Sequence, residues 1–350
     1  MVPCRERRLT PFELAVPALL SAAVLTGLVR RFALTHQLFD VPNERSSHTV
    51  PTPRGGGLAV VAIVLAGAGL LALVGRIPTE TFVALLGGAL VAWIGWLDDR
   101  RGLPARVRRA SHFAAAAWAL WWLGGLPTLT VGLGTVDLGI GGSVLACVAI
   151  VWAINLTNFM DGIDGLASSE AATVSFTAAA MLAPVNPGLA AAAAVTGGAA
   201  LGFLAWNWQP ARIFLGDVGS GFLGFVLATF GVASERSGAV PVAVWILLYM
   251  VFAVDGTFTL VRRAVRGERW YAAHRSHAYQ RMLQAGWSHQ AVTLLVVALN
   301  LMLAGLAWWA LVDRARLGLA IGGAVALCSA AYALVERVRP MEPGGRPVRG

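Results

Sequence analysis

Apolar runs of roughly membrane-spanning length alternate with short polar segments along almost the whole chain. Because about 20 apolar residues cross one bilayer, the pattern predicts an all-α polytopic membrane protein with about eleven transmembrane helices, ten being the alternative count. The predicted spans are Phe12–Phe32, Gly57–Val74, Thr81–Leu97, His112–Leu123, Gly141–Ile154, Leu166–Ala183, Leu189–Trp206, Ser220–Ala233, Val240–Val261, Ala291–Val312 and Leu317–Val335. The segment Pro127–Gly139 alternates polar and apolar residues around Gly-rich turn signals, which predicts a small external hairpin.

We expect a single integral membrane domain over residues 1–335 and a basic cytoplasmic tail over residues 336–350, which we expect to be disordered. The composition agrees, since 57% of the residues are hydrophobic and only 13% are charged, against about 25% charged in a soluble domain. All 27 basic residues are Arg. The absence of Lys excludes Schiff-base chemistry and a Walker-type phosphate loop.

The positions of the arginines predict the orientation in the bilayer. Twenty of the 27 fall on loops of one parity or on the C-terminal tail, and seven fall on the other side. The positive-inside rule makes the Arg-rich face cytoplasmic. The same pattern accounts for the net charge of +9, so we expect a lipid bilayer and no nucleic acid as a partner. Five polar segments share the cytoplasmic parity: Asp40–Gly57, Asp98–Arg109, Asn155–Gly165, Gln209–Gly219 and Arg262–Arg281.

The segment NLTNFMDGIDGLA is the densest polar cluster between two apolar runs. It carries the carboxylates Asp161 and Asp164 and the amides Asn155 and Asn158. Such groups are expensive to hold at a membrane boundary without a metal, a partner or water. Hard oxygen donors suit Mg²⁺, which completes its octahedron with water and phosphate oxygens. An ordinary solvated loop is the alternative.

Two further acidic motifs end or begin a predicted span. In WLDDRR, Asp98 and Asp99 are adjacent, so on a helix their side chains diverge and we expect different partners for them. The alternative is that both cap the helix and pair with the following arginines, Arg100 and Arg101. In FLGDVGSG, Asp217 lies between glycines just before an apolar helix, where backbone N–H groups could meet a phosphate. A simple N-cap is the alternative there.

Two basic segments on the same face could bind an anionic substrate. DVPNERSSHTVPTPRGGG carries Arg45, His48 and Arg54, and HRSHAYQR carries His274, Arg275 and His277. A solvated basic loop is the alternative for the first segment. The second lacks the Cys or Glu of a zinc site, which favours phosphate contacts.

Together these segments resemble the polyprenyl-phosphate N-acetylhexosamine-1-phosphate transferases, the bacterial glycosyl transferase family 4. The resemblance is carried by DVPNERSSHTVPTPRGGG, GWLDDRRGL, NLTNFMDGIDGLA, NWQPARIFLGDVGSGFLG and HRSHAYQR, in this order. It implies Mg²⁺-dependent transfer of a sugar 1-phosphate from a UDP-sugar to undecaprenyl phosphate, with release of UMP. It also implies a bacterial inner-membrane enzyme with a cytoplasmic active site, Mn²⁺ as an alternative metal, and a homodimer as the family's oligomeric state.

The resemblance assigns roles residue by residue. The implied catalytic residues are Asp98, Asp99, Asp161, Asp164, His274 and His277. The implied substrate-binding residues are Arg45, His48, Arg54, Asn155, Asn158, Asn207, Phe214 and Arg275. Asp217 and Asp161 are similar to the metal-binding positions.

The resemblance also has departures. The His-rich motif is shorter than that of the pentapeptide-specific members, and a lysine that helps to bind the nucleotide there is absent. The form HRSHAYQR looks more like the branch that starts O-antigen or other surface polysaccharides, which favours a UDP-N-acetylhexosamine donor. The competing hypothesis is an ion-coupled transporter, which predicts acids near the middle of the spans rather than at their ends.

Overall fold

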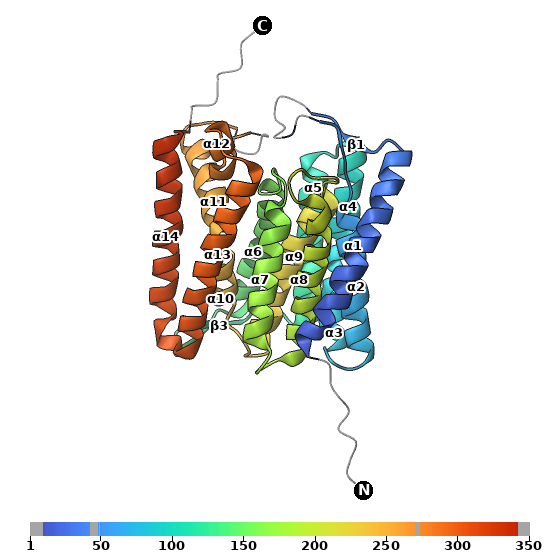
Figure 1. Cartoon of the computed structure of the whole chain (residues 1–350). Helices are drawn as coiled ribbons and strands as arrows, with labels where there is room; N and C mark the ends of the chain where they lie inside the picture. Colours follow the sequence, from blue (N-terminus) through green and yellow to red (C-terminus); the bar gives the residue numbers. More distant parts are fainter. Residues whose placement is uncertain (1–9, 43–47, 49, 270–273, 342–350) are drawn as a thin grey trace.

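The computed structural model describes residues 10–42, 48, 50–269 and 274–341. Over these residues the chain forms a bundle of helices that run up and down between two ends (Figure 1). The helices are α1 Pro11–Thr35, α2 Gly57–Leu73, α3 Thr79–Leu85, α4 Gly87–Arg101, α5 Ala105–Leu123, α6 Gly139–Phe159, α7 Leu166–Leu182, α8 Pro187–Asn207, α9 Asp217–Arg236, α10 Val242–Leu248, α11 Met250–Val265, α12 Ala278–Gln284, α13 His289–Val312 and α14 Leu317–Val338, with a 3-10 turn η1 at Arg314–Arg316. The strands are β1 Phe39–Asp40, β2 Thr52–Pro53, β3 Thr128–Val131 and β4 Gly134–Asp137.

The predicted fold class is confirmed, whereas the number of crossings stays a prediction. Within the described residues, seven helices are long and apolar enough to cross a membrane, or eight if the pair α10 and α11, bent by 74°, forms one span. The count of about eleven is therefore not confirmed. The predicted hairpin is confirmed, because β3 and β4 pair antiparallel with Thr128 opposite Asp137. The helix α14 continues three residues beyond the predicted domain boundary, and residues 342–350 of the predicted tail lie outside the described part.

The two ends of the bundle carry different connections. The strands β1 and β2 and the helix α12 lie at one end, which we call the site end, and the hairpin β3–β4 lies at the other (Figure 1). The helices α4, α6 and α8 end at the site end, and α9 begins there. The helix α1 begins at the hairpin end and α14 ends at the site end, which agrees with the predicted opposite sides for the two termini.

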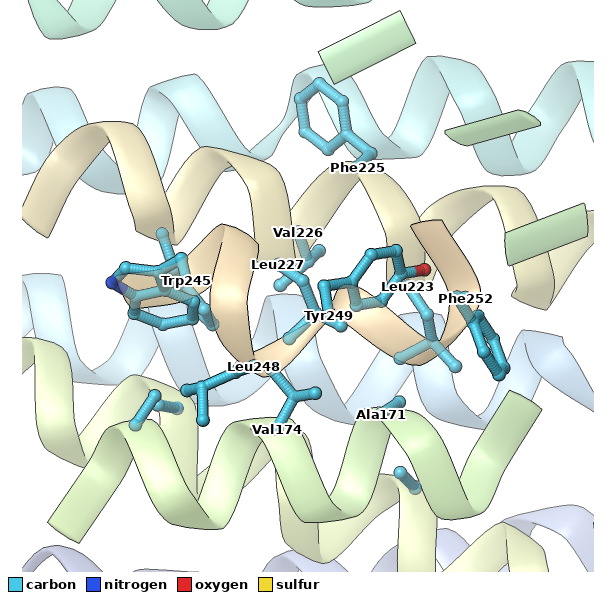
Figure 2. Packing of buried hydrophobic residues seen from close by; sticks show 14 of the residues in the cluster. Ala171, Val174, Leu223, Phe225, Val226, Leu227, Trp245, Leu248, Tyr249 and Phe252 are labelled. Carbon is cyan, nitrogen blue, oxygen red and sulfur yellow. The ribbon is translucent and has the colours of Figure 1, made fainter. Parts of the chain in front are cut away.

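The centre of the bundle is α9, which is buried on every side along almost its whole length. A helix that is buried on every side needs partners all around it, and the helices α2 to α8 and α10 supply them. Figure 2 shows Leu223 and Leu227 of α9 together with Trp245 and Tyr249, near the α10–α11 bend, and Val174 of α7. This buried packing fixes the height and rotation of α9, and with it the position of its first residue, Asp217.

Candidate active site

The site begins where α9 starts against the end of α4. Gly216 precedes α9 with φ of +75°, a left-handed conformation that favours glycine. A Cβ atom on Gly216 would lie 2.6 Å from Oδ2 of Asp99, and one on Gly95 would lie 2.5 Å from the carbonyl oxygen of Asp217. Two glycines therefore allow the carboxylates of α4 to lie directly against the first residue of α9.

The adjacent acids at the end of α4 have different partners, as predicted. Asp98 accepts hydrogen bonds from Arg108 and from the backbone N–H of Leu103. Asp99 lies 3.7 Å from Arg54, measured from Nη1 to Oδ1, and its carboxylate faces the backbone N–H groups of Asp217 and Val218 at the start of α9. The alternative pairing with the following arginines is wrong for Arg100, whose guanidinium stacks on Trp96 at 3.9 Å.

A third segment reaches Asp217 from α6. Asn158, near the end of that helix, donates hydrogen bonds from Nδ2 to Oδ1 of Asp217 at 2.7 Å and to Oγ of Ser220 at 3.1 Å. Asn155 lies one turn earlier and contacts different groups, the carbonyl oxygen of Val151 at 2.7 Å and Nδ1 of His112 at 3.4 Å. The structure therefore separates the two predicted amides, and only Asn158 belongs to the group around Asp217.

The acids of the α6–α7 loop also differ in their surroundings. Burial raises the pKa of Asp161 well above its ordinary range, and the charges of Asp217, Asp99 and Asp164 raise it further. Asp164 has partners of its own, the backbone N–H of Ala211 at 3.0 Å and Nδ1 of His289 at 3.3 Å. Asp161 is thus the carboxyl that most needs a cation or a proton.

These side chains surround one cavity of about 290 Å³ at the site end. Its lining includes the predicted residues His48, Arg54, Asp99, Asn158, Asp161, Asp164, Asn207, Phe214 and Asp217. It also includes three polar residues that sequence reasoning missed, Asp40, Gln280 and His289. Asp40 and Gln280 each lie within a recognised motif, DVPNERSSHTVPTPRGGG and HRSHAYQR, and could have been included. His289, at the start of α13, lies in none of the motifs and carries no signal of its own.

Two predicted nucleotide contacts have defined geometry in the cavity. Phe214 meets the ring of His48 edge to face, with centroids 4.8 Å apart. The amide of Asn207 is used within the fold, because Oδ1 accepts from Gly165 N–H at 2.9 Å and Nδ2 donates to the carbonyl of Ile213 at 3.0 Å. Asn207 therefore holds the loops in place beneath the cavity. Arg45 lies outside the described residues.

Comparison with known proteins identifies the family. The family model described as glycosyl transferase family 4 matches residues 81–235. Decaprenyl-phosphate N-acetylglucosaminephosphotransferase of Mycobacterium tuberculosis (strain ATCC 25618 / H37Rv) is 31% identical over 331 residues, covering 81% of this chain and 79% of its own. The probable undecaprenyl-phosphate N-acetylglucosaminyl 1-phosphate transferase of Bacillus subtilis (strain 168) is 29% identical, covering 83% and 82%. Phospho-N-acetylmuramoyl-pentapeptide-transferase of Picosynechococcus sp. is 33% identical, covering 71% of each chain.

The chain belongs to glycosyl transferase family 4. The predicted membership is confirmed, and with it the general reaction, transfer of a phospho-sugar onto a polyprenyl phosphate. The matched region contains Asp98, Asp99, Asp161, Asp164 and Asp217.

In this family member the two histidines of the segment HRSHAYQR, His274 and His277, lie beside the cavity rather than in its lining, whereas Gln280 of the same segment lines it. His277 is buried against Asp255 of α11, with Nδ1 3.4 Å from Oδ1, and its ring centroid lies 4.8 Å from that of His274. Burial, and then the charges of His277 and Arg263, lower the pKa of His274 to about 3. Here His274 is a neutral imidazole that could offer a hydrogen bond but no positive charge. Arg275 also lies outside the lining.

The helix α12 connects this segment to the acidic loop. Asp255 accepts hydrogen bonds from the N–H groups of Ala278 and Tyr279 at 2.7 and 3.1 Å, which holds the start of α12 on α11. Tyr279 in turn donates from its hydroxyl to the carbonyl of Phe159 at 2.9 Å. The histidine segment is therefore attached to the end of α6, directly before Asp161.

Proposed function

We propose that this protein transfers N-acetylhexosamine 1-phosphate from a UDP-sugar to undecaprenyl phosphate and releases UMP. One observation carries the proposal: carboxylates from three segments far apart in the sequence, Asp99, Asp161 and Asp217, line a single cavity at one end of the bundle. The competing hypothesis, an ion-coupled transporter with acids near the middle of its spans, gains no support, because these acids lie at helix ends or in a loop.

The donor set suits Mg²⁺, with Mn²⁺ as an alternative. Within the described residues no three His, Cys, Asp or Glu side chains are close enough to form a metal site by themselves. Mg²⁺ needs only one or two carboxylates when water and phosphate oxygens complete its shell. Asp217 and Asp161 would hold the ion, and in the described part of the chain the arginines paired with the neighbouring acids are Arg54 and Arg108. When bound, Mg²⁺ neutralises charge on the donor pyrophosphate.

The reaction exchanges one phosphorus–oxygen bond for another. An oxygen of the lipid phosphate attacks the sugar-linked phosphorus, and the bond from that phosphorus to the UMP oxygen breaks. Phosphoryl transfer depends chiefly on charge neutralisation and in-line positioning. Arg54, which lines the cavity beside Asp99, would contact an anionic phosphate, and Asp98 holds Arg108 near Asp217, with 3.9 Å between Nη1 and Oδ2.

The cellular setting follows from the same features. The Arg-rich loops lie at the site end, so the positive-inside rule favours a cytoplasmic active site in a bacterial inner membrane. The relatives named for N-acetylglucosamine support an N-acetylhexosamine donor. The product would start a surface polysaccharide of the O-antigen kind or another cell-wall intermediate, and a homodimer stays a prediction from the family.

The test is a donor panel with purified protein. Radiolabelled UDP-N-acetylglucosamine, UDP-N-acetylgalactosamine, a 6-deoxy UDP-N-acetylhexosamine and UDP-N-acetylmuramoyl-pentapeptide are each incubated with undecaprenyl phosphate and Mg²⁺. We expect label in the organic phase, and one UMP per lipid product, for at least one of the three simple N-acetylhexosamines. Labelled lipid from the pentapeptide donor alone would contradict the proposed donor class but not the reaction.

A further inference from the structure

A buried acid that the reaction does not use lies below the acidic loop. Glu170, in the second turn of α7, is completely buried, and Asn300 of α13 is 2% exposed. The amide Nδ2 of Asn300 donates a short hydrogen bond to Oε2 of Glu170. Within the described residues, the two remaining oxygens, Oε1 of Glu170 and Oδ1 of Asn300, have no hydrogen-bond partner.

A charged Glu170 would leave both oxygens as buried acceptors without a donor. An ionised carboxylate in an apolar interior is strongly unfavourable unless it is paired. The titratable groups near enough to feel its charge are Tyr249 and Cys328, and neither supplies a positive charge. The hydroxyl of Tyr249 is already bonded to Thr157. The described part of the chain therefore brings no cation to this carboxyl.

One proton would satisfy both oxygens at once. We propose that Glu170 is held as the uncharged acid and donates from Oε1 to Oδ1 of Asn300, closing an acid–amide pair with two hydrogen bonds that positions the acidic loop of the site. Glu170 is then a positioning residue. Two carboxamide side chains can form the same two hydrogen bonds with each other. Glu170→Gln is therefore the conservative substitution.

The pair acts on the site through the contact between α7 and α13. His289, Thr293 and Asn300 lie on one face of α13, at spacings of four and seven residues. His289 contacts the carboxylate of Asp164 at 3.3 Å, and Thr293 donates to the carbonyl of Asp164 at 3.1 Å. The Glu170–Asn300 pair fastens the same two helices further from the site end. Its loss would let the loop with Asp161 and Asp164 shift relative to α13.

Four variants test the pair. Glu170→Gln keeps both hydrogen bonds without needing a proton, and Glu170→Leu and Asn300→Leu remove them. The double variant Glu170→Gln with Asn300→Asp exchanges the acid and the amide. Glu80→Gln, at an exposed position on α3, is the control for loss of one carboxyl group.

Two readouts need no substrate and test the pair even if the proposed donor is wrong. Infrared spectra near pH 7 should show the C=O band of a protonated carboxylic acid that Glu170→Gln removes and Glu80→Gln keeps. Relative to the wild type, the melting temperature of Glu170→Gln should rise as the pH increases from about 4, because an unfolded Glu loses its proton there while the buried acid keeps it. Both leucine variants should melt lower at every pH, and the exchanged pair should restore the melting temperature.

The positioning role rests on the proposed function and is read from kinetics below the melting temperature of every variant. We expect the leucine variants to lose about tenfold or more in kcat, because a small displacement of catalytic groups slows the chemical step, while Glu170→Gln stays within twofold of the wild type. A Glu170→Gln protein that melts and turns over like Glu170→Leu, or an infrared spectrum without the acid band, would overturn the proposal. Unchanged kcat in stable leucine variants would overturn the positioning role.

Discussion

Asn158 donates a 2.7 Å hydrogen bond to Asp217, although 59 residues separate them in the chain. The bond joins the end of α6 to the start of α9 and fixes one oxygen of the carboxylate. The other carboxylate oxygen lies 3.9 Å from Arg108. The orientation of Asp217 is therefore set by residues from two other segments before any ligand arrives.

The two amides of α6 provide a matched pair of substitutions. Asn158→Leu removes a charge-assisted hydrogen bond to Asp217 and an amide from the cavity lining, so we expect a loss of about 100-fold in kcat/KM. Asn155→Leu removes contacts with His112 and Val151 outside the lining and should lose less than about fivefold. Steady-state kinetics of lipid-product formation measure both, and equal losses would contradict the assignment.

Gly95 controls the distance between α4 and α9. A methyl group there would clash with the backbone of Asp217 at 2.5 Å, so Gly95→Ala should destabilise the protein by about 1–3 kcal/mol through overpacking and lower its activity. A Cβ atom on Gly322 of α14 would have no neighbouring atom within 4 Å. Gly322→Ala should therefore be neutral or stabilise the protein by up to about 1 kcal/mol. Thermal unfolding in detergent compares the two, and a harmless Gly95→Ala would show that α4 can move away freely.

The neutral state of His274 predicts how stability changes with pH. Its pKa is lowered to about 3 in the folded protein, whereas an unfolded His titrates near 6.5. Below about pH 6.5 the unfolded chain binds a proton that the folded protein does not, so stability falls as the pH falls toward 3. The melting temperature should therefore decrease less steeply between pH 6.5 and 4.5 in His274→Gln than in the wild type. Parallel curves would contradict a neutral His274.

Asp161 should change the stability of the fold with pH in the direction opposite to that of His274. Because its pKa is raised by folding, ionisation at neutral pH opposes folding. In protein stripped of divalent ions, Asp161→Asn should raise the melting temperature at pH 7, and the gain should shrink as the pH is lowered toward 4. Added Mg²⁺ should stabilise the wild type through preferential binding to the folded state, and Asp161→Asn much less. Asp137→Asn on the exposed hairpin is the control, and an identical Mg²⁺ response in Asp161→Asn would refute its role as a ligand.

The sequence predicts the helical elements and the convergence of the acids well, because both depend on local patterns. Each predicted span coincides with a helix or a helix pair. The acids at the ends of those helices could meet only at one end of the bundle. The divergence of Asp98 and Asp99 likewise follows from helix geometry and is observed.

The remaining features depend on tertiary contacts that no local pattern encodes. His289 lines the cavity because α13 packs beside the acidic loop, and this residue lies in none of the recognised motifs. Asn207 looks like a ligand in the sequence, yet the loops beneath the cavity use its amide. The number of crossings is also undetermined by the pattern, since short and bent helices such as α2 and the pair α10 and α11 do not meet a simple length criterion.

The most direct test of the central claim is UMP release by purified protein supplied with UDP-N-acetylglucosamine, undecaprenyl phosphate and Mg²⁺. If acids from separate loops form one magnesium-dependent site, Asp217→Asn should lose at least about 100-fold in rate, chelation should stop the reaction, and Asp137→Asn should leave the rate unchanged. Release of UMP by Asp217→Asn at the wild-type rate, or in full after chelation, would contradict it.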